Sequence, residues 1–92
     1  MVTIFGQHGV SDYEKWKKAF DLIARDWFGQ LGIVSTKVYR TLDGQSVIVM
    51  HTFNSLREAR QHQQLMESAD MRKRAGEIGV KLPVTYWIVE EV

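Results

Sequence analysis

An amphipathic segment near the N-terminus, residues 10–27, constrains the fold more than any other part of the sequence. Ser11 and Glu14 have the spacing of a capping box, in which each side chain satisfies a free N–H at the start of a helix. Gly29 or Gly32 can end this helix, because glycine tolerates the left-handed conformation that follows many helices. Large apolar side chains recur at three- and four-residue steps, so one helix face must be buried. That face comprises Tyr13, Trp16, Phe20, Ile23, Ala24, Trp27 and Leu31.

Four runs rich in β-branched and aromatic residues predict strands around this helix. Asp43 and Gly44 between the second and third runs predict a two-residue hairpin turn. Ser55 and Glu58 predict the start of a second helix, and Ser68 can cap a short helix over residues 71–75. The order βαββαβ predicts one α+β domain over residues 1–92, with a ferredoxin-like antiparallel sheet and helices on one face. The predicted strands are residues 2–8, 33–42, 45–53 and 82–92.

The hairpin register separates the two faces of the predicted sheet. The turn places Arg40 opposite Val47, Val38 opposite Val49, Thr36 opposite His51 and Val34 opposite Phe53. Phe53 directly precedes the second helix, so its face is expected to pack on the helices. A solvated opposite face would alternate to polar residues, but this one keeps large apolar side chains. We therefore expect a homodimer through this open face. Its predicted contacts are Phe5, Ile33, Tyr39, Ile48 and Met50.

A small-ligand pocket is expected between the sheet and the helices. The first strand should run antiparallel to the third, with His8 near Val47, Gly6 near Val49 and Ile4 near His51. Gly6 has no side chain and leaves room beneath the first helix. Apolar walls with a few polar groups are typical of small-molecule sites. The predicted ligand contacts are Gly6, Trp16, Phe20, Arg40, His51 and His62.

His8 is the candidate catalytic residue, because a histidine that is neutral near pH 7 suits proton transfer. The alternative is a hydrogen-bonded structural histidine; in the same way, Trp16 and Phe20 can be core residues and Arg40 a salt-bridge residue. His8 and His51 would lie about 14 Å apart along adjacent strands, too far to share a metal ion. His62 is expected near the His8 end of the sheet. Two histidines fall short of the three or four ligands of a zinc site, so no metal is predicted.

The composition excludes several classes of function. The chain has no cysteine, which excludes disulfides, thiolate metal sites and cysteine nucleophiles. The formal net charge of +1 does not favour nucleic acid, and the short basic run at residues 72–74 is expected to be a solvated helix end. No apolar run approaches the roughly 20 residues that span a bilayer, and the N-terminus lacks a secretory pattern. A cytoplasmic protein without a membrane partner is therefore expected.

Several motifs together resemble the antibiotic-biosynthesis-monooxygenase-like (ABM) group of the dimeric α+β barrel superfamily. They are a strand ending in His8, the pattern Val10-x-Asp12-Tyr13-x-x-Trp16-x-x-x-Phe20-Asp21, the strand Val38-Tyr39-Arg40, and Val47-Ile48-Val49-Met50 followed by Phe53-Asn54-Ser55-Leu56-x-x-Ala59. The resemblance implies dimerisation by packing two sheets face to face.

The same resemblance implies a range of activities, among them the oxidation of quinols and polycyclic phenols without a cofactor. Haem degradation, another activity of the superfamily, is not expected, because Gln7 and His8 stand where that branch has an asparagine. The first functional hypothesis is thus a monooxygenase with no bound cofactor that acts on an aromatic or polycyclic molecule. The alternative is a non-catalytic ligand-binding or interaction module. Several polar groups around Gly6 would favour the enzyme, and a filled apolar core would favour the module.

Overall fold

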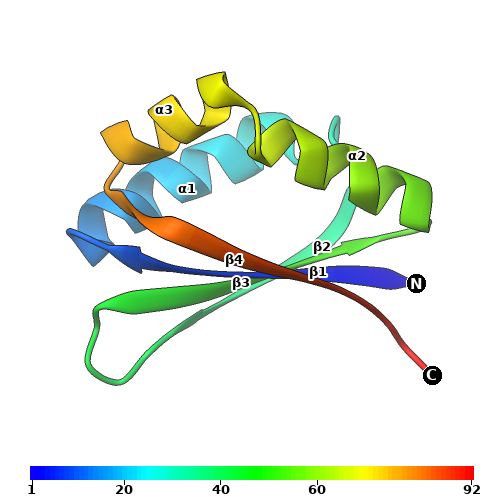
Figure 1. Ribbon diagram of the computed structural model, residues 1–92, viewed down its shortest axis with the longest axis horizontal. Helices are drawn as coiled ribbons and strands as arrows, with labels where there is room; N and C mark the ends of the chain where they lie inside the picture. Colours follow the sequence, from blue (N-terminus) through cyan, green and yellow to red (C-terminus); the bar gives the residue numbers. More distant parts are fainter.

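Three helices cover one face of a four-stranded antiparallel sheet in the computed structural model, which describes residues 1–92 (Figure 1). The strand order is β2-β3-β1-β4, so β1 and β3 are central. This arrangement confirms the predicted ferredoxin-like α+β fold. The elements are β1 (Val2–Val10), α1 (Tyr13–Trp27), β2 (Ile33–Arg40), β3 (Ser46–Phe53), α2 (Leu56–Met66), α3 (Ala69–Glu77) and β4 (Val80–Glu90).

Serine or aspartate side chains cap all three helices. Ser55 accepts from the backbone N–H of Glu58, and Ser68 accepts from that of Met71, as the sequence predicted. The prediction was wrong for α1, where Asp12 is the N-cap and accepts from the N–H of Lys15 at 3.2 Å. The neighbouring Ser11 instead lies against the residues that precede β4, where its backbone N–H donates to the Gly79 carbonyl.

The predicted register is confirmed over most of the sheet. His8 pairs with Val47, Gly6 with Val49 and Ile4 with His51 across β1 and β3. The β2–β3 hairpin also keeps the predicted pairs from Arg40 back to Thr36. Its connection is longer than the predicted two-residue turn, because the ladder stops at Arg40 and Ser46. Asp43 closes the wider loop by accepting hydrogen bonds from the Thr41 hydroxyl and the Gln45 N–H.

A β-bulge corrects the prediction at the start of β2. Ile33, not Val34, pairs with Phe53, and the register shifts between Ile33 and Ser35. The extra residue turns Ile33 toward the helices, where it packs against the buried cluster that contains Phe53, and leaves Val34 51% exposed. Ile33 was therefore wrongly assigned to the open face of the sheet.

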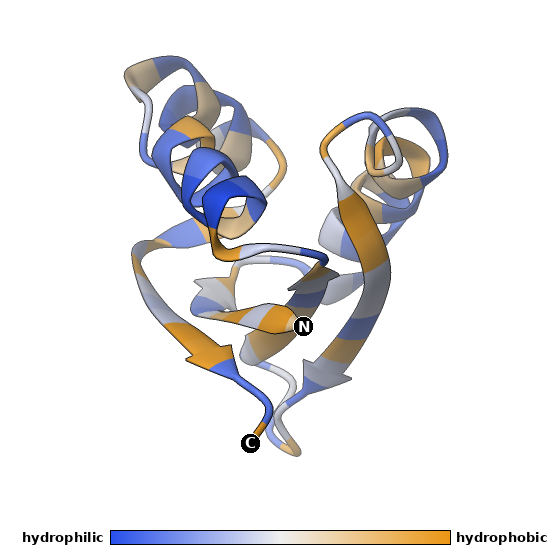
Figure 2. Ribbon diagram, turned by 90° about the vertical axis from the view of Figure 1, so that its right-hand side faces the viewer, coloured by the Kyte–Doolittle hydropathy of each residue, from blue (hydrophilic) through white to orange (hydrophobic).

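The helix layer is divided into two parts. Figure 2 shows α1 on one side of this layer and α2 and α3 on the other, all above the same sheet face. Buried apolar residues form two separate clusters rather than one continuous core. One cluster lies under α1 and the other under α2, and residues of both line the cavity described below. The clusters are Val10, Trp16, Val47 and Val49, and Ile4, Phe53 and Ala59.

Candidate active site

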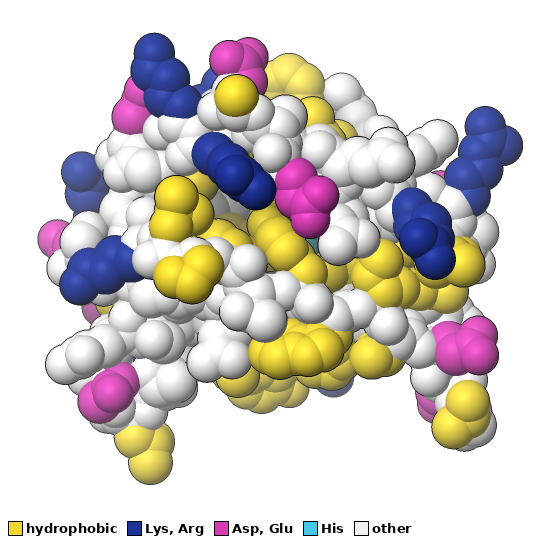
Figure 3. Space-filling view, viewed as in Figure 1, with side chains coloured by type: hydrophobic (Ala, Val, Ile, Leu, Met, Phe, Trp, Pro, Cys, Tyr) yellow, Lys and Arg dark blue, Asp and Glu magenta, His cyan; other side chains and the backbone are white.

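A cavity of about 600 Å³ lies between the sheet and the helices. Of its 24 lining residues, 17 are hydrophobic, so the ligand that it fits is mostly apolar. Figure 3 shows a hollow with hydrophobic side chains at its edge and both basic and acidic groups at its rim. The lining includes Ile4, Gly6, His8, Trp16, Phe20, Ile23, Trp27, Phe28, Val49, His51, His62, Met66, Met71, Arg72, Ala75, Ile78 and Tyr86.

Aromatic rings of α1 form one wall of this cavity. Trp16 is buried and stacks on Phe20 with ring centroids 4.8 Å apart. Phe20 in turn lies parallel to the His51 ring at 6.3 Å. These large side chains fill the space between α1 and the sheet, so the helix backbone stays at a distance from the strands. Trp16 and Phe20 thus pack in the core and also line the cavity, and their contact with a ligand stays a prediction.

His8 lines the cavity from β1 in a defined tautomer. Its Nδ1 lies 2.9 Å from the Gly9 carbonyl oxygen, and a carbonyl only accepts, so Nδ1 carries the hydrogen. In the neutral ring Nε2 is then unprotonated and able to accept a proton. Burial lowers the pKa of His8, and the hydrogen bond to Gly9 opposes this in part. His8 is therefore a neutral base at pH 7, and its ring packs edge-on against Trp16 at 5.6 Å.

His51 and His62 form a second imidazole pair on the cavity wall. Their rings meet edge to face with centroids 5.1 Å apart, and His51 Nδ1 hydrogen-bonds with the Thr36 hydroxyl at 2.9 Å. His62 Nδ1 is buried without a hydrogen-bond partner. Burial lowers the pKa of His51 to about 3, helped by His62, and that of His62 to about 4. Both rings are neutral over the physiological range.

The position of His62 differs from the prediction. It packs against His51 and Phe53 rather than near His8, because it projects from α2 over the part of the sheet where β3 ends. The structure contains no group of three or more histidine, cysteine or acidic residues that could hold a metal ion.

Arg40 is the one predicted ligand contact that does not line the cavity. It lies at the end of the edge strand β2, is exposed, and places its guanidinium 4.5 Å from the Tyr13 ring centroid. This cation–π contact holds Arg40 against the first residue of α1, away from the cavity.

Some of the lining residues were not singled out from the sequence. Arg72 and Arg74 of α3 are exposed, as expected of a solvated helix end, and they also line the cavity. Tyr86 of β4 pairs with Gly6 of β1 and faces the helices. Alternation along the last strand, with Tyr86 and Trp87 on opposite faces, was the signal that would have found it.

The imidazole pair predicts an acid-sensitive fold. In the unfolded chain His51 and His62 return toward their usual pKa of 6.5, so between pH 6.5 and pH 4 the unfolded state binds more protons than the folded state. The free energy of unfolding therefore falls as the pH drops through this window. We expect a loss of about 2 kcal/mol for each histidine between pH 6.5 and 5.

Urea unfolding at several pH values between 5 and 7.5 measures this dependence. His62→Leu should flatten it, because one of the two groups is removed, and should not destabilise the protein at pH 7.5, because the unpaired Nδ1 disappears with the ring. Equal pH slopes in the two proteins would contradict the assignment.

Comparisons with known proteins identify the fold. No family model matches the sequence, and no curated protein matches it. Solved structures do match: a putative antibiotic biosynthesis monooxygenase from Nitrosomonas europaea has a TM-score of 0.73 at 14% identity, over 100% of this chain and 99% of that chain. At these identities the likeness establishes the fold, and the predicted resemblance to ABM proteins is confirmed at that level over the full chain.

Two further structures have related names. A monooxygenase from the ActVA-Orf6 gene of Streptomyces coelicolor, solved with the ligand nanaomycin D, has a TM-score of 0.71 at 16% identity over 99% of this chain and 87% of that chain. SnoaB from Streptomyces nogalater, a cofactor-independent oxygenase, has a TM-score of 0.70 at 14% identity over 98% of this chain and 91% of that chain. No helix of the present chain has the length and apolar character needed to cross a membrane. The cytoplasmic location stays a prediction.

Proposed function

We propose that this protein is a cofactor-independent oxygenase that acts on an aromatic, polycyclic small molecule. The observation that carries the proposal is the open, mostly apolar cavity with a neutral histidine base on its wall. Trp16 and Phe20 offer ring faces against which a flat aromatic ligand stacks. Two neighbours of the same fold are described as monooxygenases, one of them as putative, and a third as a cofactor-independent oxygenase.

The reaction that fits this site begins with proton removal from the substrate. His8 Nε2 accepts a proton from a hydroxyl or an acidic CH₂ group of the bound aromatic, and the electron-rich anion supplies the electrons that reduce dioxygen. In the overall oxidation a CH₂ group becomes C=O: one oxygen atom bonds to the carbon, and the other leaves as water with the two hydrogens. The apolar walls keep bulk water away from the anion.

The non-catalytic module remains the second candidate, and the surroundings of Gly6 weigh against it. A module would be favoured by a filled core, whereas Gly6 is one of the residues that line an open cavity. His8 lies two residues from Gly6 on the same face of β1, and Tyr86 pairs directly with Gly6. These two polar groups, which line the cavity next to Gly6, support the enzyme over the module.

Oxygen uptake with a matched pair of ligands tests the proposed function. Anthrone carries an acidic CH₂ group, and anthracene has the same ring system without one. With anthrone, we expect the protein to consume dioxygen faster than the spontaneous reaction does. One molecule of ketone product should form for each molecule of dioxygen consumed. With anthracene, we expect no consumption of dioxygen. Native mass spectrometry of protein taken from cells should show added small-molecule mass. An empty protein that does not accelerate the oxidation of any hydroxylated aromatic would contradict the proposal.

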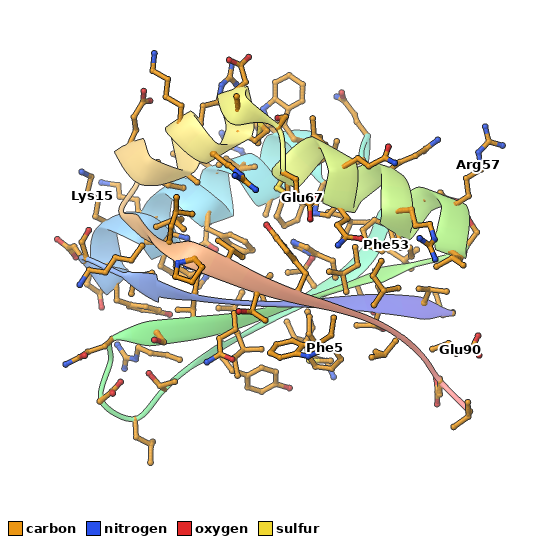
Figure 4. The ribbon with its side chains drawn as sticks, in the orientation of Figure 1. Phe5, Lys15, Phe53, Arg57, Glu67 and Glu90 are labelled. Atoms are coloured by element: carbon orange, nitrogen blue, oxygen red, sulfur yellow. The ribbon has the colours of Figure 1, made fainter.

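We also propose that the protein is a homodimer through the open sheet face. Met50, Phe5 and Trp87 are direct neighbours on β3, β1 and β4, so they form one apolar row across the sheet. In Figure 4 the labelled Phe5 points away from the helices, opposite to Phe53. Only 10 of the 92 residues are buried in the single chain, which is a small core for an independent domain. Tyr39 and Ile48 form the next row on this face.

A further inference from the structure

Tyr86 occupies the gap that Gly6 leaves in the sheet. The two residues pair across β1 and β4, and a Cβ added to Gly6 would lie 3.4 Å from Tyr86 Cε1. The ring therefore leans over β1, on the face of the sheet that is turned toward the cavity. Tyr86 also lines a smaller recess of about 220 Å³ beside the cavity, together with Glu67 and Arg72. Figure 4 shows Glu67 at the junction of α2 and α3, above this region.

The Tyr86 hydroxyl is a free hydrogen-bond donor. It has no hydrogen-bond partner in the protein, and it is not among the fully enclosed polar atoms, so it is accessible to a bound molecule. Burial raises the pKa of Tyr86, and Glu67 adds to this while Arg72 opposes it. The hydroxyl therefore stays protonated at neutral pH and can donate.

His8 lines the same cavity from the neighbouring strand β1. It follows Gly6 by two residues on the cavity face, and the β1–β4 pairing is irregular between Gln7 and Gly9, so His8 has no direct partner in β4. Bulges of this kind often re-aim a side chain next to an active site. A ligand in this cavity therefore has access to a proton acceptor from β1 and a hydroxyl donor from β4.

We propose that Tyr86 is a second catalytic group, whose hydroxyl donates a hydrogen bond to the oxyanion formed when His8 removes the substrate proton. No proton or electron passes through Tyr86; it stabilises the charge that develops on the substrate oxygen. This inference rests on the proposed function and deepens it, because the substrate must then carry an ionisable hydroxyl or enolisable carbonyl oxygen. Aromatic molecules without such an oxygen are poor ligands at this position.

The ionisation of a bound probe tests this role without any turnover. 4-Nitro-1-naphthol absorbs visible light as the anion, so its pKa can be read while it is bound to the protein under anaerobic conditions. We expect the wild-type protein to bind the anion preferentially. Tyr86→Phe keeps the ring over Gly6 and should raise the pKa of the bound probe by about 1 to 2, a roughly 10- to 100-fold fall in its ionisation constant. Tyr13→Phe is the matched control, because Tyr13 does not line the cavity.

The outcomes separate this inference from the proposed function. A probe pKa that is unchanged in Tyr86→Phe, or changed equally in Tyr13→Phe, would overturn the role of Tyr86. Failure of the wild-type protein to bind the probe would overturn it as well. Anion binding that depends on Tyr86, in a protein that does not oxidise any substrate, would support the inference while contradicting the oxygenase proposal.

Discussion

Replacing His8 with alanine should lower the turnover of a hydroxylated aromatic substrate by about 10²- to 10⁴-fold, the usual contribution of a positioned general base. The physical reason is the tautomer: the Gly9 carbonyl holds the hydrogen on Nδ1 and leaves Nε2 as the proton acceptor. The other two histidines on the cavity wall are weaker bases, because burial lowers the pKa of His51 to about 3 and that of His62 to about 4. Neither can replace His8 efficiently.

The pH profile and a matched variant check this prediction. His8 works as a base only when it is unprotonated, and its pKa lies below 6.5, so kcat/KM in the wild-type protein should be constant at neutral pH and should fall in acid. His62→Ala also removes an imidazole from the cavity wall but should change KM more than kcat. A His8→Ala variant with full kcat, or one whose acid limb is unchanged, would remove His8 from the mechanism.

The pairing register of the strands explains why the positions of most residues of the candidate site could be predicted from the sequence. The hairpin signal at Asp43 and Gly44 set the pairing of β2 and β3, and the pattern of β1 then placed Gly6 and His8 opposite Val49 and Val47. The predicted pairing is correct even though the connecting loop is longer than expected. The observed loop and the predicted two-residue turn place the same residues of β2 and β3 opposite one another. Strand alternation is strict, so a correct register assigns every side chain to a face.

The features that the sequence missed depend on tertiary context. A bulge adds one residue to β2 without a change of composition, so nothing distinguished Val34 from its neighbours. Ser11 and Asp12 are both good N-caps, and only the contact of Ser11 with the segment before β4 decides between them. The place of His62 depends on how α2 crosses the sheet, which periodicity does not determine. The sequence also does not determine whether the cavity is open. The same apolar helix face can pack closely on the sheet or be held away from it by large aromatic rings.

Replacing Trp87 with aspartate should convert the proposed dimer into a monomer. Trp87 is 48% exposed in the single chain and ends the apolar row formed with Phe5 and Met50. In a two-fold dimer the substitution occurs twice, so two carboxylates enter the interface without a partner. Each buried unpaired charge costs several kcal/mol, so we expect the dimer dissociation constant to rise by at least about 10³-fold.

The matched control for this prediction is Leu22→Asp. Leu22 is also 48% exposed, but it lies on α1, on the opposite side of the sheet from Trp87, and does not line the cavity. The cost of the new charge within a single chain is therefore similar, and any difference in assembly reports on the open face alone. Sedimentation at several protein concentrations should give a monomer for Trp87→Asp and the wild-type dimer for Leu22→Asp. A dimeric Trp87→Asp variant would place the interface elsewhere. A monomeric wild-type protein would contradict the proposed dimer and would leave the apolar row exposed.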